Sequence, residues 1–197
     1  FIKKLKNNKI ALCAGNIATP EAAKFLIKLG VDIIKIGIGP GSICTTRLVA
    51  GIGVPQLSAI LSVRNGLKNK NVKIISDGGI KYSGDLAKAF AAGASAVMMG
   101  SMFAGHDECD GEPGSFRGLA SEEIQIKMGV KNPYAEGKAG KVKDKGSVMK
   151  TIRNMQNSIN SGCSYGGVLN LSDLAKNAKF IRVSQASLEE SGHRLEI

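Results

Sequence analysis

The chain has 197 residues, of which 43% are hydrophobic, 22% are charged and 5% are aromatic, and it contains no Trp. This composition is typical of one ordinary globular domain whose core must be aliphatic. The net charge of +11 favours an anionic partner, but the basic residues are scattered and no RNA-binding signature or zinc-finger spacing is present, which argues for phosphorylated small molecules, or simple solubility, and against nucleic acid.

Short apolar runs alternate with helical patterns in the first half of the chain. Thr19-Pro20-Glu21 predicts a helix start, with Thr19 as the N-cap, and Gly30 marks the end of that helix. Residues 31–38 include five β-branched residues in eight and predict a strand. The full set of predicted strands is 9–14, 31–38, 72–76 and 95–99, and the predicted helices are 20–29, 57–68 and 84–92.

These four strand–helix units lack a two-residue hairpin signal and predict a parallel sheet, in a (β/α) barrel or a doubly wound fold. Distinctive residues follow the strands, and active sites of (β/α)8 barrels collect at the carboxyl ends of their strands. Four strands alone would leave two open sheet edges. We therefore expect an α/β fold, a (β/α)8 TIM barrel of which this chain is the C-terminal half with strands 5–8. The first half is expected upstream of Phe1 or on another chain.

The rest of the chain has a different texture. Residues 106–150 are rich in Gly, Lys and acidic residues with little periodicity, which predicts a flexible flap or active-site insertion. Residues 151–183 regain a helical pattern, and the last stretch is polar. We expect a single catalytic domain, 1–197, made of a half-barrel (1–105), a flap (106–150) and a C-terminal helix and tail (151–197).

The loop from Gly37 to Arg47 holds the most informative residues. Its glycines allow a ligand to approach the backbone closely, and its carbonyls suit a monovalent cation. Cys44 lies among hydroxyl groups and near Arg47, so it is a candidate nucleophile for attack on an electron-poor carbon. On spacing alone, a Gly-rich turn with an unreactive thiol is an equally good interpretation.

Two turns at strand ends are further candidates. Asp77, followed by Gly78 and Gly79, can accept hydrogen bonds from sugar hydroxyls, although an N-cap or turn role is about as well supported. Gly100-Ser101 can present backbone amides to a phosphate, although such turns are common.

Among the titratable residues, Glu136 is a candidate general acid or base, although a solvated charge is the commoner role of such a residue. His106 and His193 are isolated, so no His-centred triad or metal cluster can be built, and we expect surface roles for both. The four cysteines, at positions 13, 44, 109 and 163, have wide spacings that indicate no zinc site. Because nothing resembles a secretion signal or membrane span, we expect free thiols and a cytoplasmic location.

Several motifs together resemble one enzyme family. Gly39-Pro-Gly-Ser-Ile-Cys-Thr-Thr-Arg47, followed by 51–56, is similar to the catalytic loop of inosine-monophosphate (IMP) dehydrogenases and GMP reductases. Five more motifs fall in the family's order: Asp77-Gly-Gly79, Gly84-Asp85, Val97-Met-Met-Gly-Ser101, Phe116-Arg-Gly118 and Lys145-Gly146. The resemblance runs from residue 14 to residue 183. It implies half of a (β/α)8 barrel that works in a homotetramer.

The resemblance also implies roles for single residues. Cys44 would attack C2 of the purine base, with Thr46 and Glu136 helping in proton transfer. The nucleotide would contact Ser42, Gly100 and Ser101 with its phosphate, Asp77, Gly78 and Gly79 with its ribose, and also Gly118, Leu119, Ala120 and Gly137. The cofactor, NADPH or NAD, would contact Gly39 and Leu119, and Ser161, Gly162, Cys163 and Ser164 would approach the cofactor of a neighbouring subunit. A potassium ion would lie at Gly39, Gly41, Cys44 and Arg47.

The choice between the two enzymes depends on the flap. Family dehydrogenases hydrolyse their covalent intermediate with an Arg-Tyr pair, and that pair is missing between Ser121 and Glu136. Reductases use a Thr with a Glu, matched here by Thr46 and Glu136, so we expect NADPH-dependent reductive deamination of GMP to IMP and ammonia. The stretch 139–148 looks more like dehydrogenases and keeps open the conversion of IMP to XMP with NAD. An alternative of another class is a catalytically silent nucleotide-binding half-barrel or split subunit.

Overall fold

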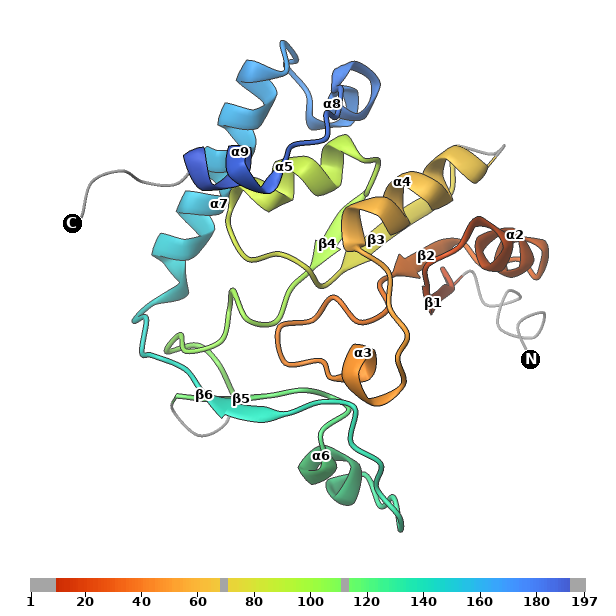
Figure 1. The fold of residues 1–197 in the computed structure, drawn as a ribbon, viewed down its shortest axis with the longest axis vertical. Helices are drawn as coiled ribbons and strands as arrows, with labels where there is room; N and C mark the ends of the chain where they lie inside the picture. Colours follow the sequence, from red (N-terminus) through yellow and green to blue (C-terminus); the bar gives the residue numbers. More distant parts are fainter. Residues whose placement is uncertain (1–9, 68–70, 111–113, 192–197) are drawn as a thin grey trace.

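The computed structural model describes residues 10–67, 71–110 and 114–191. The predicted strand start at Lys9, the predicted helix end at Lys68, and His193 lie outside the described residues. The strands are β1 (Cys13–Ile17), β2 (Ile33–Ile36), β3 (Lys73–Asp77), β4 (Ala96–Met98), β5 (Ser115–Arg117) and β6 (Ala139–Lys141) (Figure 1). The helices are α2 (Pro20–Lys28), α3 (Thr46–Val49), α4 (Gln56–Gly66), α5 (Gly84–Ala91), α6 (Glu122–Lys127), α7 (Val148–Tyr165), α8 (Leu171–Asn177) and α9 (Gln185–Glu190).

The four predicted strand–helix units form one parallel sheet, whose strand order β1-β2-β3-β4 follows the chain. The register pairs Ile34 with Ile74 and Ile75 with Ala96. A doubly wound sheet reverses its strand order at a switch point, whereas a barrel adds each strand beside the previous one. The sequential order therefore favours the barrel of the two folds that the strand pattern had left open.

The sequence patterns predicted the bounds of α2 closely and those of β1 less closely. Thr19 is the N-cap of α2, as predicted, and its hydroxyl accepts the Ala22 amide at 3.3 Å. The first strand was predicted at 9–14, but it runs from Cys13 to Ile17, because its pairing with β2 decides where the ladder begins and ends. A Gly and an Asn within this strand made its second half look like a loop.

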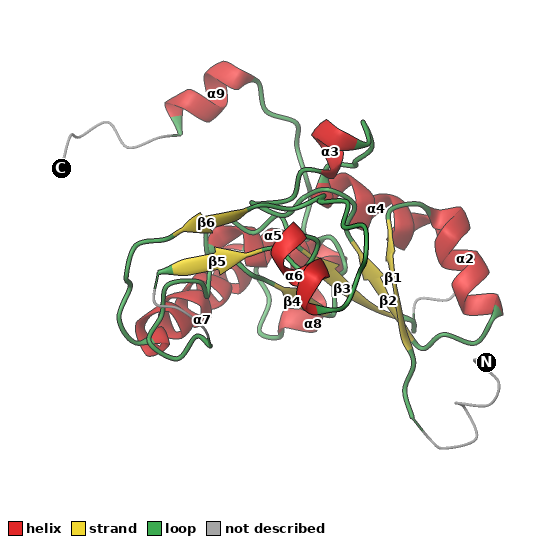
Figure 2. Cartoon of the chain, turned by 90° about the horizontal axis from the view of Figure 1, so that it is seen from below, coloured by secondary structure: helices red, strands yellow, loops and turns green. Residues whose placement is uncertain are grey.

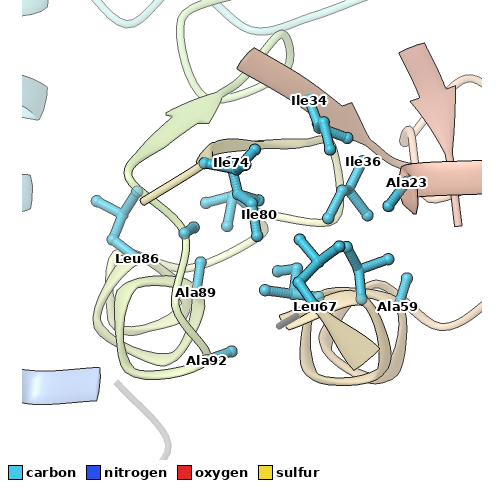
Figure 3. Packing of buried hydrophobic residues seen from close by; sticks show 14 of the residues in the cluster. Ala23, Ile34, Ile36, Ala59, Leu67, Ile74, Ile80, Leu86, Ala89 and Ala92 are labelled. Carbon is cyan, nitrogen blue, oxygen red and sulfur yellow. The ribbon is translucent and has the colours of Figure 1, made fainter. Parts of the chain in front are cut away.

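Helices α2, α4 and α5 cover one face of the sheet and enclose an aliphatic core (Figure 3). Ile34 and Ile36 of β2 and Ile74 of β3 are fully buried against Ala59 of α4 and Leu86 of α5, among others. Burial of each such side chain contributes about 1.5–3 kcal/mol of transfer free energy. Because side chains alternate along a strand, the neighbouring residues point to the opposite face, where Lys35, Asp77 and Met98 lie.

Residues 106–150 contain regular elements that the sequence pattern did not predict. Strands β5 and β6 pair antiparallel, with Phe116 opposite Gly140, and α6 lies between them in the chain. The paired strands β5 and β6 and helix α6 lie below the parallel sheet in Figure 1. Elements of three to six residues are too short for a hydrophobic period to show, which is why this segment read as irregular.

The expected surface role of His106 was wrong. The side chain is 6% exposed, and its Nδ1 lies 2.8 Å from the carbonyl oxygen of Gly146. No local pattern indicates this contact, because it depends on a partner 40 residues away.

Helices α7 and α8 pack on α5. Helix α7 begins at Val148, three residues before the predicted boundary, with Ser147 as its N-cap. Figures 1 and 2 both show α7 and α2 at opposite ends of the molecule. Within the described residues, no helix combines the length and the hydrophobicity needed to cross a bilayer.

Candidate active site

Three polar side chains form a hydrogen-bonded chain where the loop after β2 enters α3. The Cys44 thiol donates to the Thr46 hydroxyl at 3.2 Å, and that hydroxyl donates to Oε2 of Glu136 at 2.7 Å. All three residues are partly buried. The arrangement joins a thiol to a carboxylate through one hydroxyl, which is a path for moving a proton away from a nucleophile.

Glu136 reaches this loop because its own backbone is bound to it. The Thr45 amide donates to the Glu136 carbonyl at 2.9 Å, and the Lys138 amide donates to the Ile43 carbonyl at 3.0 Å. On its other side, the Glu136 amide donates to the Ala120 carbonyl at 3.1 Å. The backbone of Glu136 is therefore held from both sides by hydrogen bonds, although the sequence around it reads as a flexible segment.

The predicted nucleotide residues of the flap lie beside the same loop. Gly137 is bridged to Cys44, and a Cβ added to it would lie 3.3 Å from the Ala120 carbonyl carbon. A Cβ added to Gly118 would lie 3.3 Å from Cδ1 of Ile43. Leu119 follows with its side chain 77% exposed. The structure thus brings Gly118, Ala120, Glu136 and Gly137 to the loop that carries Cys44 or to one another.

Arg47 packs against the loop residues that are predicted to hold a cation. Its guanidinium donates to the Val54 carbonyl at 3.1 Å, and its stem lies where a Cβ on Gly39 would be, 2.9 Å from Cγ. The Gly41 carbonyl accepts the Cys44 amide at 3.1 Å and closes a turn with Ser42 exposed at its tip. Because the guanidinium is itself a cation, a potassium ion here fits the backbone carbonyls and not the Arg47 side chain.

In the part of the chain that the structure describes, no group of three or more His, Cys, Asp or Glu could hold a metal ion.

Asp77 lies at the end of β3 with two partners that sequence reasoning did not single out. Its Oδ2 accepts Nζ of Lys35 at 2.5 Å and Nδ2 of Asn16 at 3.0 Å. Asn16 also donates to the Gly37 carbonyl at 2.8 Å. The three side chains come from three neighbouring strands, so the parallel register assembles them. A Lys in the middle of an apolar strand was the one signal that could have identified this cluster.

Of the two glycines after Asp77, Gly78 makes room for the loop at Pro40 and Gly79 makes room for α4. Gly78 and Gly79 have φ angles of +86° and +79°, and a Cβ on Gly79 would lie 2.9 Å from Cβ of Gln56. Gln56 donates to the Ile36 carbonyl at 2.8 Å and to the Ser76 hydroxyl at 3.0 Å. This packing fixes the turn that carries Asp77, and Gln56 is a second residue that the sequence analysis did not single out.

The turn at Gly100-Ser101 follows β4 and lies beside β5. The Gly100 carbonyl accepts the amides of Phe103 and Ala104 at 3.0 and 3.1 Å, which gives the turn a helical shape. A Cβ on Gly100 would lie 3.1 Å from the ring of Phe116. The predicted phosphate turn is therefore packed against the flap.

Residues 161–164 are the predicted site residues that are not brought to Cys44. They lie in the last turns of α7, where Cys163 is buried and a Cβ on Gly162 would lie 2.7 Å from Cβ of Ala87 in α5. Ser161 and Ser164 are exposed. Their expected contact with the cofactor of a neighbouring subunit stays a prediction.

Two carboxylates near the site have low pKa values with clear causes. The hydrogen bond from Arg117 lowers the pKa of Glu123, and the pair links β5 to α6. Burial raises the pKa of Asp85, but the Tyr82 and Lys81 amides and the Lys88 ammonium together bring it below its ordinary value. Both carboxylates are fixed in the charged form and serve structural roles.

Comparison with known proteins identifies this arrangement. Residues 1–194 match the sequence model of the IMP dehydrogenase / GMP reductase domain. The chain is 41% identical to an inosine-5'-monophosphate dehydrogenase of Chlorobaculum tepidum, over 95% of this chain and 42% of that protein. It is 45% identical to a GMP reductase of Buchnera aphidicola subsp. Schizaphis graminum, over 94% of this chain and 57% of that protein.

A solved structure gives the same result. A crystal structure of a GMP reductase variant from Trypanosoma brucei, in complex with guanosine 5'-monophosphate, superposes with a TM-score of 0.93 and 39% identity. The match covers 100% of this chain and 44% of the other. The chain thus has the fold of part of that enzyme, and it spans about half the length of the relatives that it matches.

Proposed function

The chain belongs to the IMP dehydrogenase / GMP reductase family, and we propose that it carries the catalytic residues of a GMP reductase. Its four parallel strands are half of a (β/α)8 barrel. The observation that carries the proposal is the hydrogen-bonded chain from Cys44 through Thr46 to Glu136. The Thr and Glu are the pair that the resemblance assigns to reductases.

In the proposed reaction, the Cys44 sulfur attacks C2 of GMP, and a bond forms between sulfur and carbon. The thiol proton passes to Thr46 and Glu136, which return a proton to the exocyclic nitrogen as the C2–N bond breaks and ammonia leaves. Each group acts over the short distances that general acid–base catalysis needs. The nicotinamide cofactor, when bound, supplies a hydride to C2, after which the Cys44 thiolate leaves and IMP is released.

The side chains near the Cys44 loop have chemical groups that suit a nucleotide and a nicotinamide cofactor. Asp77 can accept ribose hydroxyls while Lys35 compensates its charge. The exposed side chain of Leu119 offers an apolar surface that is suited to contact the nicotinamide ring. NADPH, the potassium ion on the carbonyls of 39–44, the homotetramer and a cytoplasmic location remain parts of the proposal.

IMP dehydrogenase is the second candidate, and one observation favours it. Several relatives named as dehydrogenases match 92–97% of this chain at 40–43% identity. That reaction needs a group that activates water, and the segment between Ser121 and Glu136 contains no Arg. Tyr134 is exposed there, and its backbone is bound by Gln125 at 2.8 and 2.9 Å.

A paired assay of the complete protein tests the proposal. GMP with NADPH is followed by the loss of reduced cofactor and the release of ammonia, and IMP with NAD is followed by the growth of NADH. Ammonia release with loss of NADPH supports the reductase. Growth of NADH alone would replace it by the dehydrogenase, and silence in both assays would favour a binding or split-subunit role.

A further inference from the structure

A lysine outside the catalytic loop is bound to the turn that follows β4. Nζ of Lys145 donates to the Ser101 carbonyl at 3.0 Å and to the Met102 carbonyl at 3.4 Å, across a sequence separation of 44 and 43 residues. We propose that Lys145 is a positioning residue that orients the backbone amides of this turn toward the nucleotide phosphate; the inference rests on the proposed nucleotide binding.

The geometry of the peptide bond explains how a lysine on carbonyls can act on amides. In a trans peptide the C=O of one residue and the N–H of the next point in opposite directions. When Lys145 holds the Ser101 carbonyl, the N–H of Met102 is directed to the opposite side of the turn. The lysine thus fixes an N–H donor without touching the ligand that the donor serves.

The amides of this turn are divided between two tasks. The Phe103 and Ala104 amides donate to the Gly100 carbonyl and build the turn itself. Among the described residues, the amides of Ser101 and Met102 have no acceptor within the protein. Successive free N–H groups in a helical turn form an anion-binding concavity. Lys145 orients one of these two donors, the Met102 amide, beside the free Ser101 amide.

Lys145 is itself held in place by its backbone neighbours. Its amide donates to the Gly105 carbonyl at 2.8 Å, and the Asp107 amide donates to the Gly146 carbonyl at 3.2 Å. The buried ring of His106 contacts the same Gly146 carbonyl at 2.8 Å. Gly105 has φ +86°, and a Cβ there would lie 2.3 Å from the Lys143 carbonyl oxygen. Residues 143–146 therefore lie close to the turn, which places the Lys145 side chain within reach of the Ser101 and Met102 carbonyls.

Glu108, which follows the turn, binds the start of α7. The Glu108 carboxylate accepts the Ser147 hydroxyl at 2.7 Å and the Val148 amide at 2.8 Å. These two hydrogen bonds lower the pKa of Glu108, so the carboxylate stays charged at the positive end of the helix. The phosphate turn, Lys145 and the first turn of α7 consequently form one connected unit.

Binding to the complete protein tests the role of Lys145. We would measure the dissociation constants of GMP and of guanosine by calorimetry for the wild type, Lys145→Met and Lys145→Arg, with Lys143→Met as the control. Guanosine lacks the phosphate, so it reports the rest of the site. The exposed Lys143 side chain is a charge two residues away, so its loss measures the general electrostatic effect on the nucleotide.

We expect Lys145→Met to weaken GMP binding by about tenfold, equivalent to about 1.4 kcal/mol, and to leave guanosine unchanged, since the charge-assisted hydrogen bonds that orient the phosphate donor are lost. Lys145→Arg should recover most of the affinity, because a guanidinium can also donate to two carbonyls. Equal losses for GMP and guanosine, an unchanged GMP affinity, or an equal loss in Lys143→Met would each overturn the inference. If the wild type binds neither GMP nor IMP, the proposed function fails and the inference fails with it.

Discussion

The Thr46 hydroxyl donates to the Glu136 carboxylate across 2.7 Å, although 90 residues separate the two in the chain. Backbone hydrogen bonds on both sides of Glu136 create this contact, so it is built into the fold and does not depend on a bound ligand. If the pair moves the proton of Cys44, its two members should behave as one unit when either is changed.

Replacement of Thr46 tests the central link of this chain. Thr46→Val keeps the shape but removes the hydroxyl, and we expect kcat to fall by about 10²–10⁴. Thr46→Ser retains the hydroxyl and should keep most of the turnover. Steady-state kinetics of the complete protein measure both, and equal activity of the Val and Ser variants would exclude the hydroxyl from the reaction.

Glu136→Gln should lower kcat by a similar factor, because the amide cannot take the proton that the hydroxyl passes on. The double variant with Thr46→Val should be little slower than the slower single variant, as expected for residues that act together. The exposed Glu122 on α6 provides the matched control, and Glu122→Gln should leave kcat unchanged. Additive losses in the double variant would show that the two side chains act independently.

Cys44→Ala should abolish turnover while GMP still binds, since the nucleotide contacts lie mainly in other loops. A covalent protein–nucleotide adduct should be seen by mass spectrometry during turnover of the wild type and not in this variant. Cys13→Ala, which alters an exposed thiol of β1, serves as the control and should behave as wild type. Normal turnover of Cys44→Ala would rule out the covalent mechanism.

Two glycines with positive φ should differ in their tolerance of Ala. Gly37 has φ +152°, and a Cβ there would lie 2.2 Å from the Asp77 carbonyl oxygen, whereas Gly51 has φ +69° and open space around it. Gly51→Ala should cost about 1–2 kcal/mol of unfolding free energy from strain alone. Gly37→Ala should cost clearly more, because the backbone at the end of β3 must move. Urea unfolding of the two variants compares them, and equal losses would contradict the close approach.

The lowered pKa of Asp85 should make part of the free energy of unfolding depend on pH. Its folded pKa lies below the ordinary 3.8, so its contribution is complete above about pH 4 and is lost as the pH falls through the folded pKa. Asp85→Asn should therefore lower the unfolding free energy at pH 7, and the gap to the wild type should narrow in acid. Urea titrations at pH 7 and pH 3 measure it, and a gap that widens in acid would reverse the sign of this argument.

Much of the parallel sheet could be predicted from local patterns. The N-cap at Thr19 and the β-branched run before Gly37 are signals that a few neighbouring residues create. The strand at 13–17 was displaced in the prediction because its ends are decided by pairing with β2, which no local pattern records. The short strands 115–117 and 139–141 were missed for the same reason.

The sequence by itself determined the alternation of strands and helices, the candidate thiol at Cys44 and the resemblance to a family of nucleotide enzymes. These depend on residue types at fixed spacing, which one reading of the chain reveals. Only the tertiary structure decided that Thr46 contacts Glu136 and that Lys35 and Asn16 donate to the same oxygen of Asp77. The same holds for the hydrogen bond from Lys145 to the Ser101 carbonyl. Each of these contacts joins distant segments, and their distances are set by strand register and loop packing, which no run of neighbouring residues encodes.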